Sequence, residues 1–350
     1  MTGSCDAAIP MKIKKLKILL IAIFLLAAIF YVLSLRPLPE TITYGVSFSK
    51  LHSDELELDW KETLLAILDD LGVRHVRFSA HWPMVEPEDD KFNFSELDFQ
   101  MDEARKRNVS VILAVGRRLP GWPECHEPDW LKSEAGNRKS ETEAVAYRQE
   151  QTLKYIERVV VRYKSYENIK YWQVENEPHL SFFSRSLCGP LDEEFLQKEI
   201  ALVHKIDPSR QVLITDSGEF GTWYKAYRHH GEVFGTSMYL YVWWKWGPIR
   251  YPITPAFFRI KQGLIELVYG KKPKILIELS AEPWLRQPIV GTPNEILLSR
   301  MGIDKFNEMI DFASKTDFDT QYLWGAEWWY WLKKNGITDD HWDRAQELFK

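Results

Sequence analysis

The 350-residue sequence lacks several features that would point to particular functions. Outside its N-terminal segment it has no cluster of basic residues, and its formal net charge is only −5. Nucleic acid is therefore not an expected partner, because proteins that bind it present a basic patch to the phosphates. The histidines His81, His126 and His179 fit no common metal-ligand spacing. We expect neither a metal nor another cofactor.

Long apolar runs are also scarce, and only Ile18 to Leu35 has the length to span a bilayer. The lysine-rich KIKKLK before it would keep the N-terminal end in the cytoplasm. A cleaved signal peptide is the alternative, which would give a secreted protein. The run is longer than a usual signal core, and SLRPLPE has no clear cleavage site. We expect a cytoplasmic tail at 1–17, a transmembrane anchor at 18–35 and an extracytoplasmic domain at 41–350, in the periplasm or at the cell surface.

Cysteine is rare, with three residues in the chain. In the expected topology Cys5 stays inside, whereas Cys125 and Cys188 lie outside, where disulfides persist. We expect both in loops on the same side of the fold. A bridge between them is possible, and so are two free thiols, because sequence alone does not give the geometry of a pair.

Past the apolar run, eight β-rich segments alternate with amphipathic segments. The predicted strands are 42–48, 73–79, 109–115, 169–174, 211–215, 233–239, 273–279 and 320–326. Such alternation implies parallel strands with right-handed crossovers, and eight repeats match a (β/α)8 TIM barrel. An open doubly wound sheet is the alternative, but no glycine-rich phosphate loop follows the first strand. We therefore predict the barrel.

Helical spacing supports this alternation. Apolar residues recur at helical spacing from Trp60 to Leu71, and Gly72 stops that helix. Ser95 opens the next helix, with Asp98 three residues on in a near-capping-box arrangement. Further helices are expected at 191–206, 256–268 and 339–349.

The carboxyl ends of the predicted strands are rich in polar and aromatic residues, and chemistry in such barrels occurs at those ends. These residues are Arg77, His81, Trp82, Arg117, Arg118, Trp122, Glu124, His126, Asn176, Glu177, Asp216, Ser217, Glu219, Tyr239, Tyr241, Glu278, Trp324 and Glu327. A crown this dense indicates a binding or catalytic site rather than ordinary loops.

Two motifs carry a family resemblance. VENEP after the fourth strand and ILIEL at the seventh resemble the signature of clan A glycoside hydrolases, which include cellulase-like, xylanase-like and β-galactosidase-like enzymes. RFSAHWPMVEPEDDKFNFSELD at the second strand is similar to a run found in that clan, although Asn93-Phe94 departs from its usual wording. The resemblance extends over the whole chain from about residue 41.

The resemblance implies roles for individual residues. Glu177 corresponds to the acid/base and Glu278 to the nucleophile of a retaining (β/α)8 enzyme. Substrate-binding positions implied in the same way are Arg77, Asn176, Tyr239 and Trp324, to which we add His81, Trp82 and His126 as sugar contacts. Glu282 is a second carboxylate past the seventh strand, and it is either a substrate contact or the nucleophile itself. Flat rings near strand ends (Trp82, Trp122, Trp172, Trp324, Trp328) are candidates for stacking on sugars or for core packing.

Two carboxyl groups suit this chemistry because a glycosidic oxygen must be protonated as its bond breaks, while an ionised partner attacks the anomeric carbon. The expected function is therefore hydrolysis of a β-linked glucan, xylan or galactoside. The oligosaccharide or polysaccharide and the membrane are the expected partners. A non-catalytic glycan-binding barrel and a transglycosylase with the same residues are the alternatives.

Overall fold

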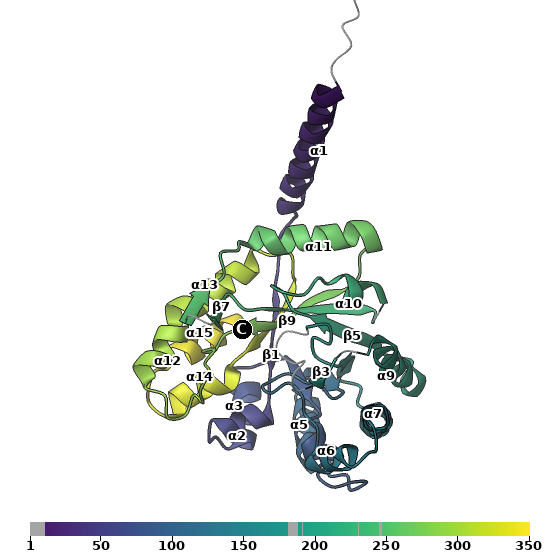
Figure 1. The fold of residues 1–350 in the computed structure, drawn as a ribbon. Coiled ribbons are helices and arrows are strands. Elements are labelled where there is room, and N and C mark those ends of the chain that lie inside the picture. Colours follow the sequence, from purple (N-terminus) through teal and green to yellow (C-terminus); the bar gives the residue numbers. More distant parts are fainter. Residues whose placement is uncertain (1–10, 181–187, 191, 230, 245–246) are drawn as a thin grey trace, which may run out of the picture.

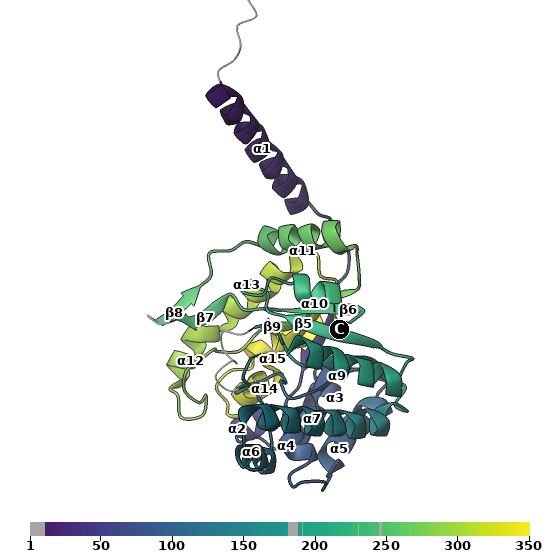
Figure 2. The same ribbon diagram turned by 45° about the vertical axis from the view of Figure 1, so that its right-hand side comes forward.

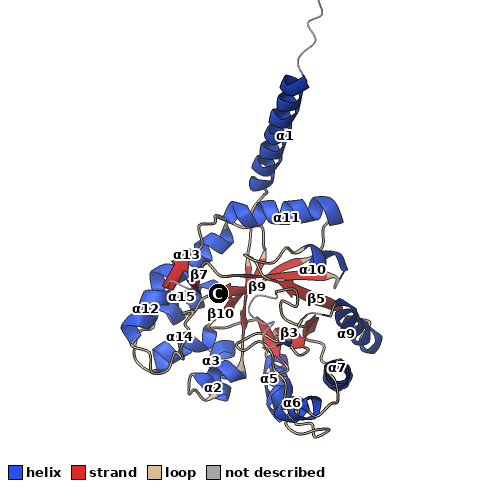
Figure 3. Cartoon of the chain, in the orientation of Figure 1, coloured by secondary structure: helices blue, strands red, loops and turns tan. Residues whose placement is uncertain are grey.

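The computed structural model describes residues 11–180, 188–190, 192–229, 231–244 and 247–350. Helix α1 (Met11–Ser34) projects away from a barrel of parallel strands that is surrounded by helices (Figures 1 and 3). The barrel closes in the order β1-β10-β9-β6-β5-β4-β3-β2. The predicted (β/α)8 barrel is confirmed, and the open doubly wound sheet is wrong.

Each of the eight predicted strand segments overlaps one barrel strand, and β5 and β9 each extend one residue past the predicted end. The barrel strands are β1 (Thr43–Ser47), β2 (His75–Ser79), β3 (Ser110–Val115), β4 (Ile169–Val174), β5 (Gln211–Asp216), β6 (Val233–Met238), β9 (Lys274–Ser280) and β10 (Thr320–Trp324). The helices around them are α2 (Lys50–Glu55), α3 (Trp60–Asp69), α4 (Trp82–Val85), α5 (Ser95–Lys106), α6 (Asp129–Gly136), α7 (Glu141–Tyr163), α9 (Glu193–Ile206), α10 (Tyr224–His229), α11 (Pro255–Tyr269), α12 (Asn294–Met301), α13 (Ile303–Ser314), α14 (Ala326–Lys334) and α15 (Asp340–Leu348).

Two apolar layers hold the barrel together. One fills its interior and consists of Ile112, Leu213, Val233, Ile275, Ile277 and Tyr322. The other lies between the strands and the helices, and it includes the predicted helix residues Leu64 and Ile67, which are fully buried. Strands buried on both faces need apolar side chains on both, which explains their near-continuous hydrophobic runs. Polar side chains are therefore concentrated where the strands end.

The capping box predicted at Ser95 is wrong. Helix α5 begins at Ser95, with Phe94 as its N-cap residue and no side-chain cap. The Asp98 carboxylate instead accepts a hydrogen bond from the Tyr163 hydroxyl at 2.8 Å and pairs with Arg162. Because both partners come from α7, Asp98 ties two neighbouring barrel helices together rather than closing its own helix.

Two regions of the chain depart from the predicted pattern. An antiparallel hairpin of β7 (Tyr241–Trp244) and β8 (Gly247–Arg250) follows β6, at a place where no strand was predicted. Strand β10 ends at Trp324, and α14 begins at Ala326, so the predicted last strand is two residues too long. The sequence from 326 onward mixes tryptophans with charged residues at helical spacing, and it forms an amphipathic helix against the barrel.

Helix α1 matches the predicted apolar segment. Residues Lys15–Ser34 form a helix long and apolar enough to cross a membrane, and almost none of it is buried against the rest of the protein. Its position near the N-terminus fits a signal anchor or a signal peptide equally well. Helix α11 lies across the end of α1 in both views (Figures 1 and 2). The predicted location of Cys5 concerns a residue outside the described part of the chain.

Candidate active site

Glu278 lies within β9 near its carboxyl end. Its side chain accepts hydrogen bonds from a residue of β2 and from the residue that follows β6. Its Oε2 accepts a hydrogen bond from Arg77 Nη2 of β2 at 2.5 Å, and its Oε1 accepts one from the hydroxyl of Tyr239, which follows β6. Arg77 is 1% exposed, and its Nε and Nη1 have no partner in the described structure. Among the described residues Arg77 forms its ion pair with Glu278, and this bond fixes the carboxylate in place.

Tyr239 is a donor that keeps its proton. Burial raises the pKa of Tyr239 well above its ordinary value, and the negative charge of Glu278 raises it further. The backbone amide of Tyr239 donates to Glu219 Oε1 at 2.8 Å, and the Trp284 ring lies against the phenol with centroids 5.3 Å apart. The hydroxyl that faces Glu278 is thus held from two sides.

Glu177 lies on the loop after β4, with a left-handed backbone at φ 44°. Its amide donates to Thr215 Oγ1 of β5 at 2.7 Å, which anchors this unfavourable conformation. Burial raises the pKa of the Glu177 carboxyl well above its usual range, and the negative charges of Glu124 and Glu278 raise it further. A hydrogen bond from the Ser237 hydroxyl opposes this shift. The carboxyl therefore holds a proton at a pH where an exposed glutamate is ionised.

Glu175, two residues before Glu177, has a structural task. It also has a left-handed backbone, at φ 59°, and its two carboxylate oxygens accept the amides of Arg117 and Arg118, each at 2.7 Å. A side chain at Gly116 would place its Cβ 2.4 Å from Glu175 Oε1, so glycine leaves the room this bond needs. The carboxylate thus organises the loop after β3.

Asn176 lies between these two glutamates and is 4% exposed. Its Oδ1 accepts a hydrogen bond from Gln173 Nε2 at 3.1 Å, and its backbone amide donates to the Arg118 carbonyl at 2.8 Å. Because the carbonyl end of the side chain is occupied by Gln173, the orientation of the amide group is set before any ligand binds.

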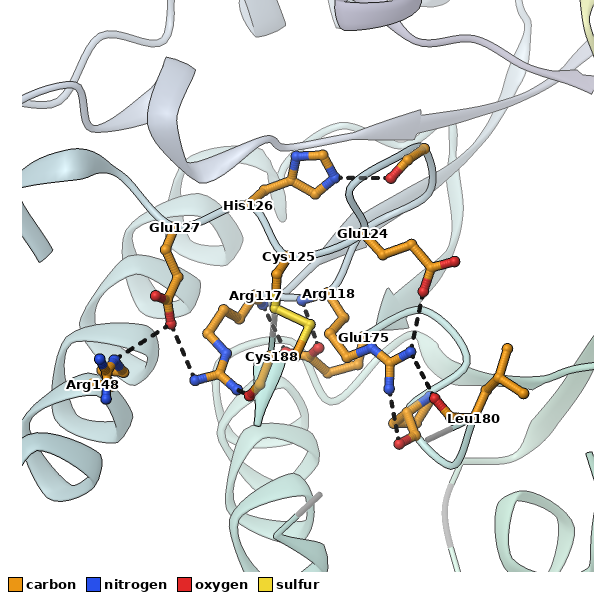
Figure 4. Close-up of a disulfide and its surroundings, with 12 residues drawn as sticks. Arg117, Arg118, Glu124, Cys125, His126, Glu127, Arg148, Glu175, Leu180 and Cys188 are labelled. Atoms are coloured by element: carbon orange, nitrogen blue, oxygen red, sulfur yellow. Dashed lines mark hydrogen bonds and ion pairs between the residues drawn. A yellow bond between two sulfur atoms is a disulfide. The ribbon is translucent and has the colours of Figure 1, made fainter. Parts of the chain in front are cut away.

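The loop after β3 is fastened to the segment after Glu177 (Figure 4). The structure contains the disulfide Cys125–Cys188 that was predicted as possible. Arg118 donates to the carbonyls of Pro178 and Leu180, at 3.1 and 3.3 Å, and pairs with Glu124 at 3.2 Å. The charge of Glu124 acts on Glu177, and that of Glu278 acts on Glu124, so Glu124 is a third carboxylate near these two glutamates. It belongs to the crown predicted from sequence, but nothing in its local sequence marks it as a neighbour of both glutamates.

Glu282 forms a hydrogen bond with a tryptophan of the next strand, β10. Its Oε1 accepts from Trp324 Nε1 at 2.7 Å, and its Oε2 is 2.6 Å from Nε2 of His52 in α2. The His52 ring stacks on Trp324 with centroids 6.0 Å apart. Burial by itself lowers the pKa of His52, but the charge and hydrogen bond of Glu282 raise it well above its ordinary value. His52 was not predicted as a site residue, and its position just after β1 is the one sequence signal for it.

The two predicted histidines lie together at the mouth. His81 and His126 are 3% and 5% exposed, and their ring centroids are 4.6 Å apart. Burial lowers the pKa of both, so both rings are neutral at neutral pH. His126 Nε2 is 3.3 Å from the Gly121 carbonyl. Contact of either ring with a sugar remains a prediction.

The predicted sugar contact by Trp82 is wrong. Its ring is fully buried and stacks on Tyr155 with centroids 4.9 Å apart, while its Nε1 donates to Glu86 at 2.7 Å. Trp172 and Trp328 are also fully buried and belong to the core. Trp324 keeps 8% of its surface exposed at the barrel mouth, and Trp122 is 68% exposed on the loop after β3.

Behind Tyr239 lie two buried ionisable residues, Glu219 and Lys261, which have no role in the expected chemistry. Burial raises the pKa of Glu219 to about 7 and lowers that of Lys261, on α11, to about 8. Lys261 Nζ donates to the Gly218 carbonyl at 2.6 Å. This lysine therefore fixes the turn from which Glu219 holds the Tyr239 backbone. Within the described residues, no group of three or more His, Cys, Asp or Glu side chains is placed to hold a metal ion.

Sequence comparison gives one family. The profile of glycoside hydrolase family 42, described as beta-galactosidase, matches residues 55–283. That range includes Arg77, Asn176, Glu177, Tyr239 and Glu278. A search of curated proteins found no match.

Solved structures share the barrel at low identity. The β-galactosidase from the haloarchaeon Halorubrum lacusprofundi aligns with a TM-score of 0.57 at 16% identity, over 88% of this chain and 57% of that one. The β-galactosidase from Rahnella sp. R3 gives 0.57 at 13%, over 89% and 56%. A GH5_18 protein from Bifidobacterium longum gives 0.53 at 16%, over 81% and 70%. This chain thus spans just over half the length of the two β-galactosidases, and at such identities the likeness concerns the fold.

Proposed function

The chain belongs to glycoside hydrolase family 42, a family of clan A glycosidases, and we propose that it hydrolyses β-glycosidic bonds with retention of configuration. Glu177 is the acid/base and Glu278 the nucleophile in this proposal. The observation that carries it is the contrast between the two carboxyls. One has a raised pKa, and the other is paired with Arg77 and Tyr239.

The reaction proceeds in two steps. In the first, protonated Glu177 donates its proton to the glycosidic oxygen while the Glu278 carboxylate attacks the anomeric carbon, so the leaving sugar departs as an alcohol. In the second, Glu177 accepts a proton from water as that water displaces Glu278. The result is a free sugar of unchanged anomeric configuration and both glutamates restored. Asn176 would bind the 2-hydroxyl of the sugar, and Trp324 would support the sugar ring.

A β-galactoside is the substrate that the family description favours. The chain is shorter than the β-galactosidases it resembles, so the loops and domains that shape their sites are not all matched. Specificity depends on loop shape rather than on the barrel, and β-glucosides and β-xylosides therefore belong in the same test.

The first experiment measures the full-length chain in detergent against aryl β-galactosides, β-glucosides and β-xylosides, with Glu278→Ala and Glu282→Ala beside it. We expect Glu278→Ala to lose on the order of 10⁶-fold in kcat, as removal of a nucleophile does elsewhere. Azide should restore turnover of this variant and give an α-glycosyl azide. Glu282→Ala should keep a measurable rate that azide does not change.

Three other outcomes would change the assignment. Azide rescue of Glu282→Ala in place of Glu278→Ala would make Glu282 the nucleophile. Sugar binding without turnover by the wild type would favour a non-catalytic glycan-binding barrel. Transfer of the glycosyl group to added sugar faster than to water would identify a transglycosylase.

We also propose that α1 remains attached as a membrane anchor, with residues 1–17 cytoplasmic, 18–35 in the membrane and the catalytic domain, 41–350, outside. Arg36, which follows the apolar run directly, pairs with Glu266 at 2.7 Å and Asp317 at 2.8 Å, and both carboxylates are nearly buried. Cleavage after Arg36 would remove this cation and leave both carboxylates without it. The disulfide fits an oxidising compartment. Retention of the chain in membranes after alkaline carbonate washing tests the anchor, and release of a shortened chain would favour secretion.

A further inference from the structure

The outer face of α11 exposes apolar side chains that no described part of the chain covers. Leu264, Leu267 and Val268 are 37%, 69% and 70% exposed, and Tyr269 after them is 37% exposed. The first three follow i, i+3, i+4 spacing and therefore lie on one face. The opposite face, which includes fully buried Phe258 and Gln262, packs on the barrel. This helix is thus apolar on two sides, and only one side faces the core.

The exposed face adjoins the point where α1 meets the barrel. A Cβ placed on Gly263 would be 2.6 Å from Leu33 Cδ2, so the last turn of α1 rests directly on α11. One turn further on, Glu266 forms its ion pair with Arg36. The junction between the apolar helix and the globular domain therefore lies against α11, as Figures 1 and 2 show.

We propose that this face of α11, defined as Leu264, Leu267, Val268 and Tyr269, lies in the head-group region of the bilayer that α1 crosses. The proposal rests on the membrane anchoring proposed above. A helix that touches the end of a membrane span is held at the depth of the lipid head groups, where an apolar face gains by burial and a tyrosine ring is favoured. Lys271, exposed just beyond Tyr269, is placed to meet lipid phosphates.

The contact would fix how the barrel faces the membrane. Barrel helices run alongside the strands, so a bilayer against α11 sets the barrel axis close to the membrane plane. The mouth that contains Glu177 and Glu278 then opens along the membrane surface. Glycans lying on that surface would reach it more readily than glycans arriving from above.

The test uses the full-length chain with Cys5→Ser, reconstituted into phosphatidylcholine vesicles, in which Cys125 and Cys188 remain disulfide-bonded. Val268→Cys carries an environment-sensitive fluorophore, and Val161→Cys on α7 is the matched control, because Val161 is also exposed (50%) but lies on another helix. Phosphatidylcholine with a doxyl group on its acyl chain is the quencher. We expect blue-shifted emission and several-fold stronger quenching at position 268 than at 161.

Flotation of the vesicles separates the two proposals. Equal, weak quenching at both positions in protein that floats with the vesicles would overturn the α11 contact and leave the anchor intact. Protein that fails to float would overturn the anchor, and the α11 contact with it. Glycosidase activity, measured on each labelled variant, shows that the barrel is folded.

Discussion

The two sides of the barrel mouth carry the same residue in contrasting surroundings. Glu177 and Glu278 are each 9% exposed, so burial of the residue alone does not distinguish them. Glu278 accepts hydrogen bonds from a guanidinium and a phenol hydroxyl. The pKa of Glu177, in contrast, is raised by burial and by the like charges of Glu124 and Glu278. Burial and like charges together raise the pKa of Glu177, whereas Glu278 has a guanidinium and a phenol as partners, and this difference distinguishes the proposed acid from the proposed nucleophile.

The backbone conformations of Glu177 and Glu278 also differ. Glu278 lies within strand β9, and the closed barrel brings Arg77 of β2 and Tyr239, just after the adjacent strand β6, to its side chain. Glu177 lies just past a strand end, at a left-handed residue, in a loop fastened by Arg118 and a disulfide. The proposed nucleophile is therefore positioned by the barrel strands, and the proposed acid by the added cross-links of its loop.

Removing the acid should give the largest effect on this contrast. We expect Glu177→Ala to lower kcat/KM by about 10²- to 10⁴-fold on substrates with poor leaving groups, which need a proton to depart. Dinitrophenyl glycosides, whose leaving group needs no proton, should lose far less in the glycosylation step. Glu157→Ala, at an exposed glutamate of α7, is the control. A uniform loss across leaving groups would contradict the acid role.

Opening the disulfide should weaken the acid side selectively. We expect the double variant Cys125→Ser, Cys188→Ser to lose about 2–5 kcal/mol of stability, because the bridge closes a long loop between cysteines 63 positions apart in the sequence. Thermal unfolding with and without reductant measures this loss. Below the unfolding temperature, kcat/KM should fall less for dinitrophenyl substrates than for substrates with poor leaving groups. A loss of the same size on both would show that the two sides are not independent.

Loss of the phenol hydroxyl should weaken the nucleophile side. We expect Tyr239→Phe to lower kcat by roughly 10- to 100-fold, since a hydrogen bond to a charged group contributes about 1.5–3 kcal/mol. Tyr241→Phe is the control, because that hydroxyl bonds Glu308 instead of Glu278. Equal rates for the two variants would remove Tyr239 from the nucleophile's support.

Neutralising a like charge should give the smallest and most specific change. The charge of Glu124 raises the pKa of Glu177, so Glu124→Gln should lower that pKa. Because the acid must be protonated, activity falls as pH rises through its pKa, and the alkaline limb of kcat/KM should move to lower pH. Glu127→Gln, which changes a carboxylate paired with Arg117 (Figure 4), should leave the limb in place. An unmoved limb in Glu124→Gln would separate Glu124 from the acid.

The sequence by itself determined the barrel and the strand ends. Alternating strand and helix periodicity is a local property, and the handedness rule for parallel strands then brings the carboxyl ends to one mouth. Arg77, Asn176, Glu177, Tyr239 and Glu278 could therefore be named in advance as neighbours. The VENEP and ILIEL motifs added the expected chemistry.

Only the tertiary structure decided which side chains bond to which. Arg77 and Glu278 are 201 positions apart, and His52 and Glu282 are 230 apart. Trp82 was expected at a sugar and is buried, and Asp98 was expected to cap its helix and bonds α7 instead. Local patterns do not carry such pairings, because burial and charge at one residue depend on groups delivered by distant segments. For the same reason the raised pKa of Glu177 is a property of the assembled mouth.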